Sequence, residues 1–192
     1  MPSEAPRLTD PKRLRALSHP LRWKLLMLIG DEETATATQC AEELGESVAS
    51  CSYHLNMLAK YGFIEEAEGG QGREKPWKSV STSMSISPEG MDPESAAIAE
   101  AAGEAYLEQE FEAIGNRLRN RHNEPEAWRK VSSTHATQMY LTAAETAELT
   151  DKIADLLREY TTKWEKPEGR PDEARRVHYF LSSTVAPPRK GQ

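Results

Sequence analysis

The sequence predicts a mainly α-helical fold with a small amount of β structure (α+β). Residues that start helices recur along the chain, and apolar residues follow them at helical spacing. Two short β-type segments flank a glycine-rich turn in the first half. The 192 residues are 38% hydrophobic and 29% charged, which suits one folded domain, or two small ones, with a polar surface.

The first half is expected to contain four helices. One starts at Asp10-Pro11 and another at His19-Pro20, where a capping side chain is followed by a residue suited to the first helical turn. The second of these is expected to end at Gly30-Asp31. Two shorter helices are predicted over residues 38–44 and 48–60, with a glycine-containing turn between them. The order therefore includes a helix-turn-helix.

A β-hairpin and then a linker follow these helices. Strands are predicted over residues 63–66 and 77–80. A serine alternation over residues 79–90 predicts a strand that runs into a linker, so we place a domain boundary near residue 88. The expected division is an N-terminal domain of residues 8–86, a mainly helical C-terminal domain of residues 91–185, and flexible tails at residues 1–7 and 186–192.

The second half is expected to contain two long helices, over about residues 92–121 and 142–164, the latter opened by a Thr-Ala-Ala-Glu capping box. Each carries apolar residues at 4-3-4 spacing: Leu107, Phe111, Ile114 and Leu118 in the first, and Leu149, Ile153, Leu156 and Tyr160 in the second. These residues are expected to form core, either within one chain or between two chains. Residues 134–141 and 176–181 are interpreted as strands.

The helix over residues 48–60 has two different faces. At about 100° per residue, Cys51, Leu55 and Leu58 share an apolar face. The opposite face carries small and polar side chains: Ala49, Tyr53, Asn56 and Lys60, with Ser50 beside them. No Asp or Glu occurs from residue 47 through residue 61, although 31 of the 192 residues are acidic. One face is expected to pack, and the other suits an approach to phosphates.

The formal net charge of the chain is −7, and it is unevenly distributed. Residues 1–80 contain 10 basic and 12 acidic residues, which leaves 14 and 19 for residues 81–192. The net charge argues against a polyanionic partner, but its distribution permits one in the nearly neutral first half. The acidity predicts weak non-specific binding to DNA and a shallow salt dependence for each half-site.

Several motifs together resemble a known family. They are His-Pro-Leu-Arg at residues 19–22, the segment 39–47, Ser-Tyr-His-Leu at residues 52–55, and Tyr-Gly-Phe-Ile at residues 61–64. Over roughly residues 8–82 the chain resembles the ArsR/SmtB-like winged helix-turn-helix transcriptional regulators. Gly-Arg-Glu-Lys-Pro-Trp at residues 72–77 resembles the wing of a subgroup with a long C-terminal extension.

The resemblance implies a homodimeric repressor that binds double-stranded DNA at an inverted-repeat operator. Helix 48–60 of each protomer would enter the major groove, with wing 65–80 at the groove edge. By resemblance, DNA contacts are expected from Ser47, Ser50, Ser52, Tyr53 and His54 in the helix, and from Arg73, Lys75 and Lys78 in the wing. The exposed helix face adds Asn56 and Lys60. The expected dimer seam is Leu107, Phe111, Ile114 and Leu118.

Other interpretations remain open at this point. His54 can instead pack against the preceding helix, and the wing cations can belong to an ordinary charged loop. The whole winged helix can instead be a protein-interaction module that binds no specific DNA.

The resemblance argues against metal sensing. Metal-sensing members carry a Cys-x-Cys pair where this chain has Thr36 and Thr38, and residues 148–160 contain no His for a second kind of site. Cys40 and Cys51 fall at packing positions. No cofactor is expected, but an unknown small-molecule effector remains open, with a pocket lined by aromatic side chains: Trp128, Tyr140, Trp164, Tyr179 and Phe180.

Enzyme and membrane functions are not expected. The chain contains no phosphate loop, nucleotide fingerprint, Gly-x-Ser-x-Gly or His-Glu-x-x-His motif. The apolar run over residues 25–29 is far shorter than the roughly 20 residues that span a bilayer. With only two cysteines, the sequence suits a reducing compartment, so a cytoplasmic location is expected.

Overall fold

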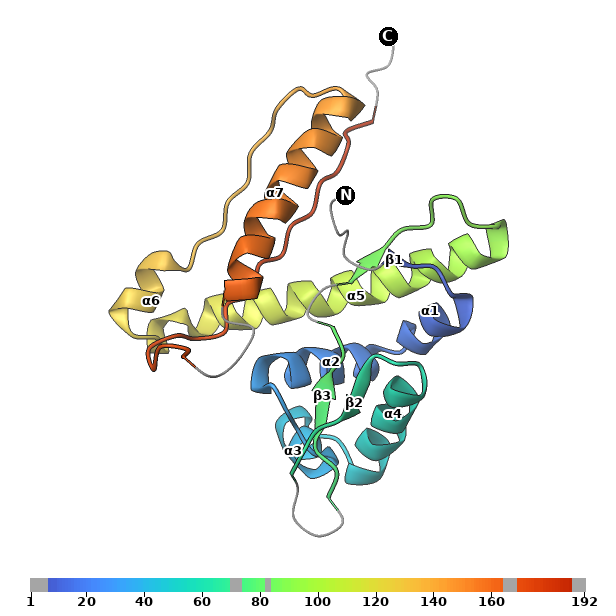
Figure 1. Ribbon diagram of the computed structural model, residues 1–192, viewed down its shortest axis with the longest axis vertical. Coiled ribbons are helices and arrows are strands. Elements are labelled where there is room, and N and C mark those ends of the chain that lie inside the picture. The colour runs from blue at the N-terminus through green and yellow to red at the C-terminus, as the bar shows by residue number, and fades with distance from the viewer. Residues whose placement is uncertain (1–6, 70–73, 82–83, 164–168, 188–192) are drawn as a thin grey trace. The chain divides into compact units, whose positions relative to one another are not determined.

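The computed structural model describes residues 7–69, 74–81, 84–163 and 169–187 (Figure 1). The chain divides into two compact units, Met1–Asp151 and Lys152–Gln192, and is mainly helical with little β structure, as predicted. The elements in chain order are β1 (Arg7–Leu8), α1 (Pro11–Leu17), α2 (Pro20–Glu32), α3 (Ala37–Leu44), α4 (Val48–Lys60), β2 (Ile64–Glu66), β3 (Trp77–Ser79), β4 (Ser85–Ile86), α5 (Pro93–Asn120), the 3-10 helix η1 (Arg121–Asn123), α6 (Glu126–Val131) and α7 (Ala143–Lys163).

Helices α1 and α2 begin where the sequence predicts them. The side chains of Asp10 and His19 each accept a hydrogen bond from a backbone amide two residues on, at 2.9 and 3.2 Å. The predicted end of α2 at Gly30-Asp31 is wrong, because the helix continues to Glu32 and ends at Glu33, whose φ is 65°. Glycine weakens a helix but does not stop it unless its backbone leaves the helical conformation.

Helices α3 and α4 form the predicted helix-turn-helix. Thr36 and Gln39 cap the start of α3 with a reciprocal pair of hydrogen bonds. Gly45 ends α3 in the left-handed conformation, with φ at 66°, where the absence of a Cβ avoids a clash. Ser47 then accepts from the amide of Ser50 at 3.1 Å and starts α4. Local chemistry therefore fixes both ends of the turn.

The predicted hairpin is present as β2 and β3. The two strands are antiparallel, with Ile64 opposite Ser79 and Glu66 opposite Trp77. Ala35 exchanges two backbone hydrogen bonds with Trp77, at 3.0 and 2.9 Å, and so holds the hairpin against the start of α3. Of the serine-rich segment, β4 forms a short strand that pairs in parallel with β1.

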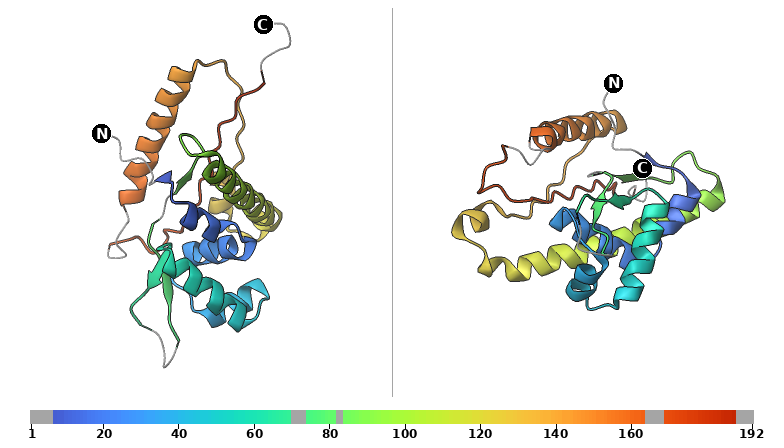
Figure 2. Two further views of the ribbon diagram at one scale, coloured as in Figure 1. Left: turned by 90° about the vertical axis from the view of Figure 1, so that its right-hand side faces the viewer. Right: turned by 60° about the horizontal axis from the view of Figure 1, so that its bottom comes forward.

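Helix α5 packs on α1 and α2, on the side away from α3, α4 and the hairpin (Figures 1 and 2). Its small residues Ser95, Ala99 and Ala102 are buried, and Tyr106 packs on Trp23 with ring centroids 4.8 Å apart. Three exposed ion pairs join the same helices: Arg15 with Glu94 at 2.8 Å, Lys24 with Glu112 at 3.5 Å, and Arg117 with Asp31 at 2.6 Å. These small residues allow α1 and α2 of the same chain to approach α5 closely.

The hydrophobic core lies where α1, α2, α3, α4 and the hairpin meet. The most completely buried apolar side chains there include Leu14, Leu17, Leu25, Ile29, Leu55, Leu58 and Ile64. Burying a side chain of this size contributes about 1.5–3 kcal/mol. Cys40 and Ala41 of α3 and Trp77 of β3 belong to the same core. Because every element of the helix-turn-helix and wing contributes, the core fixes how α4 and the hairpin stand relative to each other.

Packing does not follow the predicted boundary near residue 88. The unit that contains the helix-turn-helix also contains α5 and continues to Asp151. The division into residues 8–86 and 91–185 therefore stays a prediction about function. Most of the predicted flexible tails, 1–6 and 188–192, lies outside the described residues.

The segments after α5 depart most from the predictions. Residues 134–141 and 176–181 do not form the strands that we expected, and the short helix α6 was not predicted. Tyr140 is 94% exposed, and alternation makes a strand only where a second strand pairs with it.

The capping box that opens α7 is present, since the amide of Glu145 donates to Thr142 Oγ1 at 3.2 Å and the amide of Thr142 donates to Glu145. No helix among the described residues has the length and apolar character needed to cross a membrane.

Candidate nucleic-acid interface

The inner face of α4 is apolar and fully packed. Cys51, Leu55 and Leu58 are buried there, and Cys40 of α3 is buried beside them. Burial raises the pKa of the Cys40 thiol to about 11, and burial also raises the pKa of Cys51. Both thiols are therefore protonated near neutral pH. Their placement agrees with the packing positions predicted from sequence.

The outer face of α4 carries most of the residues predicted to contact DNA. Tyr53 is 59% exposed, and Ser47, Asn56 and Lys60 are exposed as well, while Ser50 and Ser52 are half-buried. Asn56 Nδ2 donates to the backbone carbonyl of Ser52 at 2.7 Å, which holds the amide along the helix. The face is polar, and the charged residue that it carries, Lys60, is basic.

His54 lies on the inner side of α4 and is 8% exposed. Its Nδ1 accepts from Arg22 Nε at 3.2 Å, and its ring packs on His19 with centroids 4.3 Å apart. Burial lowers the pKa of His54, and the charges of His19 and Arg22 lower it further. The ring is therefore neutral near pH 7. The packing interpretation describes His54 better than a DNA contact does, although its partner is α2 and not the helix directly before α4.

The described cations of the hairpin are each paired with a carboxylate. Lys78 Nζ lies 3.1 Å from Glu65, and Lys75 forms an ion pair with Glu66 on the opposite strand. All four side chains are exposed, so each pair contributes only about 0–1 kcal/mol and can exchange its partner for a phosphate. Arg73 lies outside the described residues.

A shallow groove of about 220 Å³ separates the start of α3, the outer face of α4 and the base of the hairpin. Its lining includes Thr36, Thr38, Val48, Ser52, Asn56 and Lys75. Sequence reasoning missed the part played by Thr38 and Val48, because the groove exists only once three elements meet. The capping box at residues 36–39 was the available signal, since it marks a helix start whose amides point outward.

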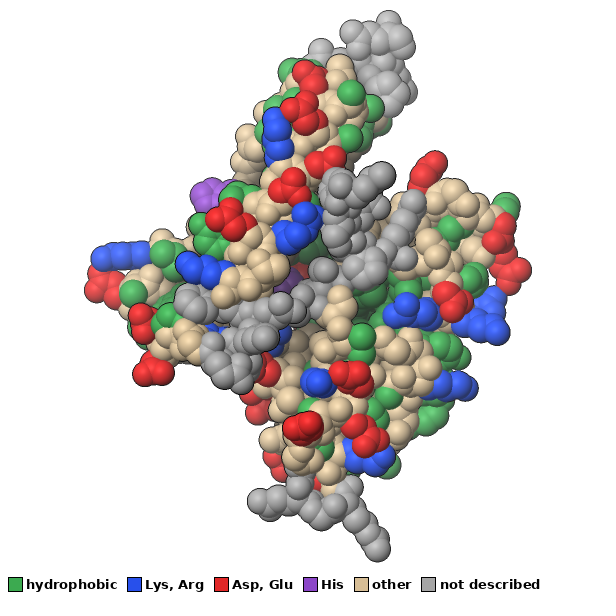
Figure 3. Space-filling model, viewed as in Figure 1, with side chains coloured by type: hydrophobic (Ala, Val, Ile, Leu, Met, Phe, Trp, Pro, Cys, Tyr) green, Lys and Arg blue, Asp and Glu red, His purple; other side chains and the backbone are tan. Residues whose placement is uncertain are grey.

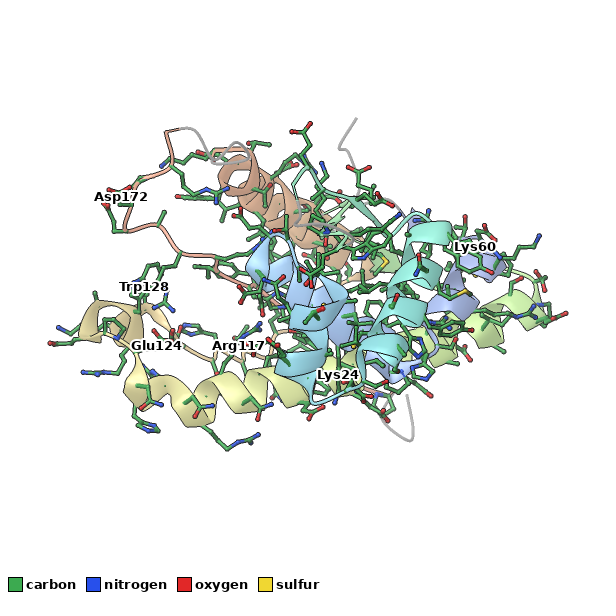
Figure 4. All side chains as sticks on the ribbon, turned by 90° about the horizontal axis from the view of Figure 1, so that it is seen from below. Lys24, Lys60, Arg117, Glu124, Trp128 and Asp172 are labelled. Carbon is green, nitrogen blue, oxygen red and sulfur yellow. The ribbon has the colours of Figure 1, made fainter. Side chains whose placement is uncertain are left out.

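Charges of both signs are mixed over the described residues. On the face shown in Figure 3, basic and acidic side chains alternate without a large patch of one sign among the coloured residues. Figure 4 shows Lys60 at the far end of α4 and Lys24 on α2. An interface with DNA on this unit would therefore use a few placed cations and hydroxyls, not a broad basic surface.

The predicted dimer seam lies on α5 and is open to solvent in the single chain. Leu107, Phe111 and Leu118 are 38%, 60% and 47% exposed, and Ile114 is half-buried. In α7, Leu149, Leu156 and Tyr160 are exposed as well. Neither 4-3-4 set is therefore core within the described chain, and a core shared between two chains stays a prediction.

Comparison with known proteins supports the coarse interpretation of this unit. Residues 17–67 match the family model of a helix-turn-helix domain. The matched segment begins at the end of α1 and covers α2, α3, α4 and β2, so it contains most of the core and the whole outer face of α4. No curated protein matches the chain significantly.

The structure gives no further support to a metal site or to the aromatic effector pocket among the described residues. The described residues hold no group of three or more His, Cys, Asp or Glu side chains placed to bind a metal ion. Of the aromatic residues predicted to line an effector pocket, Trp164 lies outside the described residues, Trp128 and Tyr140 belong to the first compact unit, and Tyr179 and Phe180 belong to the second. The aromatic pocket stays a prediction.

Proposed function

We propose that this chain is a sequence-specific DNA-binding transcriptional regulator of the ArsR type that acts in the cytoplasm as a repressor. The observation that carries the proposal is the outer face of α4. It is an acid-free helical surface, held outward by a capped turn and a packed inner face, with a hairpin beside it. A repressor of this kind would act by covering a promoter.

The side chains of this face suit the reading of a major groove. An amide such as that of Asn56 can pair with the edge of adenine, and the serine hydroxyls can donate to or accept from either kind of base pair. Lys60 and the wing cations suit phosphates, which position the protein without reading sequence. The proposed contact set is Ser47, Ser50, Ser52, Tyr53, Asn56 and Lys60 of α4 with Arg73, Lys75 and Lys78 of the wing.

We further propose a homodimer formed through the seam of α5. The 4-3-4 spacing is symmetric about its middle, so two antiparallel copies of α5 would place Leu107 opposite Leu118 and Phe111 opposite Ile114. The charges of α5 support the same pairing. Its first two thirds carry acidic residues and its last turns carry Arg117 and Arg119, so each acidic stretch would meet the basic end of the other copy.

A gel-shift experiment on DNA upstream of the chain's own coding region tests DNA binding. We expect specific retardation by the full-length protein, lost on Tyr53→Ala and weakened on Arg73→Ala. Because few phosphates are contacted, the binding constant should fall with salt along a shallow slope for each half-site. Glu159→Gln on α7, an exposed carboxylate outside the proposed DNA contacts and the seam of α5, is the matched control and should bind like the wild type.

Three outcomes would contradict the proposal or one of its parts. No binding to any promoter fragment at low salt would remove DNA from the function and favour the protein-interaction alternative. A steep salt slope would show that the protein neutralises many more phosphates than the described cations provide. Equal loss of specific and non-specific binding on Tyr53→Ala would show that Tyr53 does not read sequence.

A further inference from the structure

A second concave surface lies at the end of α5, where η1 leads into α6. Arg121, His122, Glu126, Arg129 and Lys130 line a shallow depression of about 460 Å³. Figure 4 shows Glu124 and Trp128 in the turn and helix that border it, with Arg117 before them on α5. The depression is large enough for a small molecule, since ligand sites measure roughly 300–1,000 Å³.

The charge of this segment is opposite to that of the chain. Residues 117–130 contain five Arg and Lys residues and two Glu residues, whereas the chain as a whole carries −7. Like charges at close range repel one another, and a bound anion would relieve that repulsion. The concentration of positive charge coincides with the concave surface.

Backbone contacts orient both guanidinium groups of the depression. Arg129 Nη1 donates to the carbonyl of Glu124 at 2.8 Å, and Arg121 donates to the carbonyl of Arg129. A guanidinium has five N–H donors, and these backbone contacts use one on each. The other donors of each group remain available, and a guanidinium can bind carboxylate or phosphate oxygens through two parallel hydrogen bonds.

Glu126 is the one acidic side chain among the described residues that line the depression. Its carboxylate forms an ion pair with Lys130 at 2.7 Å across one turn of α6. Both side chains are largely exposed, so the pair is weakly held and Lys130 can turn to another anion. The net charge of the lining is then still positive, from Arg121, Arg129 and Lys130 against one Glu.

We propose that this depression binds a small anion that carries two or more negative charges, such as a phosphate ester or a polycarboxylate. A small molecule is favoured over the DNA backbone because α5 packs on the side of α1 and α2 away from α4 and the hairpin. The lining of the depression begins four residues beyond Arg117, whose ion pair with Asp31 joins α5 to the end of α2. Any effect of the anion on DNA binding rests on the proposed function, but anion binding itself does not.

The experiment follows the arginine side chains directly. We would label the full chain with ¹⁵N-arginine and titrate it with sodium pyrophosphate, and separately with sodium citrate, at constant ionic strength set with sodium chloride. We expect saturable shifts of the Nε–H signals of Arg121 and Arg129 with half-saturation below about 1 mM. Pyrophosphate and citrate separate phosphate from carboxylate specificity, and saturable binding of either supports the proposal.

Variants locate the site. Arg121→Gln and, separately, Lys130→Gln should each weaken binding about tenfold, which corresponds to the loss of one charge-assisted contact. Arg119→Gln is the matched control on the same helix, because Arg119 contacts Asn116 and does not line the depression; it should bind within about twofold of the wild type. Circular dichroism confirms that each variant retains its helices.

Three results would overturn the proposal. One is a shift that grows without saturation and affects all arginines alike, and another is no response to either anion. The third is a stronger response to a random-sequence DNA duplex than to pyrophosphate, which would make the segment a contact for the DNA backbone. None of these titrations requires an operator sequence, so a failed gel shift and a failed anion titration are distinguishable.

Discussion

One side-chain atom, Nδ1 of His54, connects α4 to α2 through a hydrogen bond. Nδ1 of His54 accepts from Arg22 Nε, and Arg22 Nη1 donates to the carbonyl of Ala16 at 2.6 Å. Arg22 thereby links α4 with the end of α1. His54 can accept this hydrogen bond only while Nδ1 is unprotonated, so the link depends on the neutral form of the ring.

This dependence predicts how stability changes with pH. The pKa of His54 is lowered from 6.5 in the folded chain by burial and by its charged neighbours, so the unfolded chain binds the proton more tightly. The stabilising contribution is complete above about pH 6.5 and is lost as the pH falls toward the lowered pKa. We expect His54→Gln, which keeps an acceptor but does not titrate, to lose less stability than the wild type between pH 7.5 and pH 5.5.

Urea unfolding at both pH values measures this difference. His122→Gln is the matched control, because His122 is exposed on η1, outside the helix-turn-helix, and its ring hydrogen-bonds the carbonyl of Arg119. It should show the pH dependence of the wild type. An identical pH dependence in His54→Gln and the wild type would mean that the contact with Arg22 does not control the protonation of His54.

Residue-level prediction worked where the cause is local and failed where it is tertiary. The capping roles of Asp10, Ser47 and Thr142 follow from a few consecutive residues, and the structure confirms all three. The position of His54 next to the apolar face of α4 left both interpretations open. Only the packing of α2 decided that it is buried.

The turn between α3 and α4 sets the angle between these two helices, and α4 is the proposed recognition helix. Gly45 has φ at 66°, a conformation in which a Cβ costs about 1–2 kcal/mol. We expect Gly45→Ala to lower the free energy of unfolding by about 1 kcal/mol in urea denaturation. Space is not the reason, since no atom lies within 4 Å of a Cβ built on this glycine.

Gly30 provides a matched control within α2. It has no atom within 4 Å of an added Cβ either, and its φ is negative and helical. Gly30→Ala should therefore leave the stability unchanged or raise it by up to about 1 kcal/mol, because alanine loses less conformational freedom on folding. A similar response of the two variants would show that backbone conformation does not distinguish these positions.

Elements were predictable to the extent that their hydrogen bonds are internal. Helices α3, α4 and α5 satisfy their backbone within one segment and lie within a residue or so of the predicted bounds. Strands need a partner, and this explains both outcomes for β structure. The hairpin was predicted because its two strands lie close together in the sequence, on either side of a glycine-rich segment, whereas residues 134–141 have no strand to pair with among the described residues.

Helix α5 carries two different surfaces, and this is the main feature of the larger architecture. In the first unit α5 buries one face on α1 and α2 while its seam stays open, and its acidic stretch precedes its basic end. The sequence predicted the seam but not the intrachain face, because alanines at close spacing fit either partner. A helix that packs on both sides would connect the dimer contact rigidly with the helix-turn-helix.

A dimer through this seam predicts a specific loss on one substitution. Phe111 is 60% exposed in the single chain and would lie opposite Ile114 of a second copy, so Phe111→Glu would bury an unpaired charge at a cost of several kcal/mol. Light scattering should give twice 21.5 kDa for the wild type and 21.5 kDa for the variant. Val131→Glu is the control, since Val131 is exposed at the end of α6 and outside the seam. A monomeric wild type at tens of micromolar, or a dimeric Phe111→Glu variant, would place the dimer contact elsewhere or remove it.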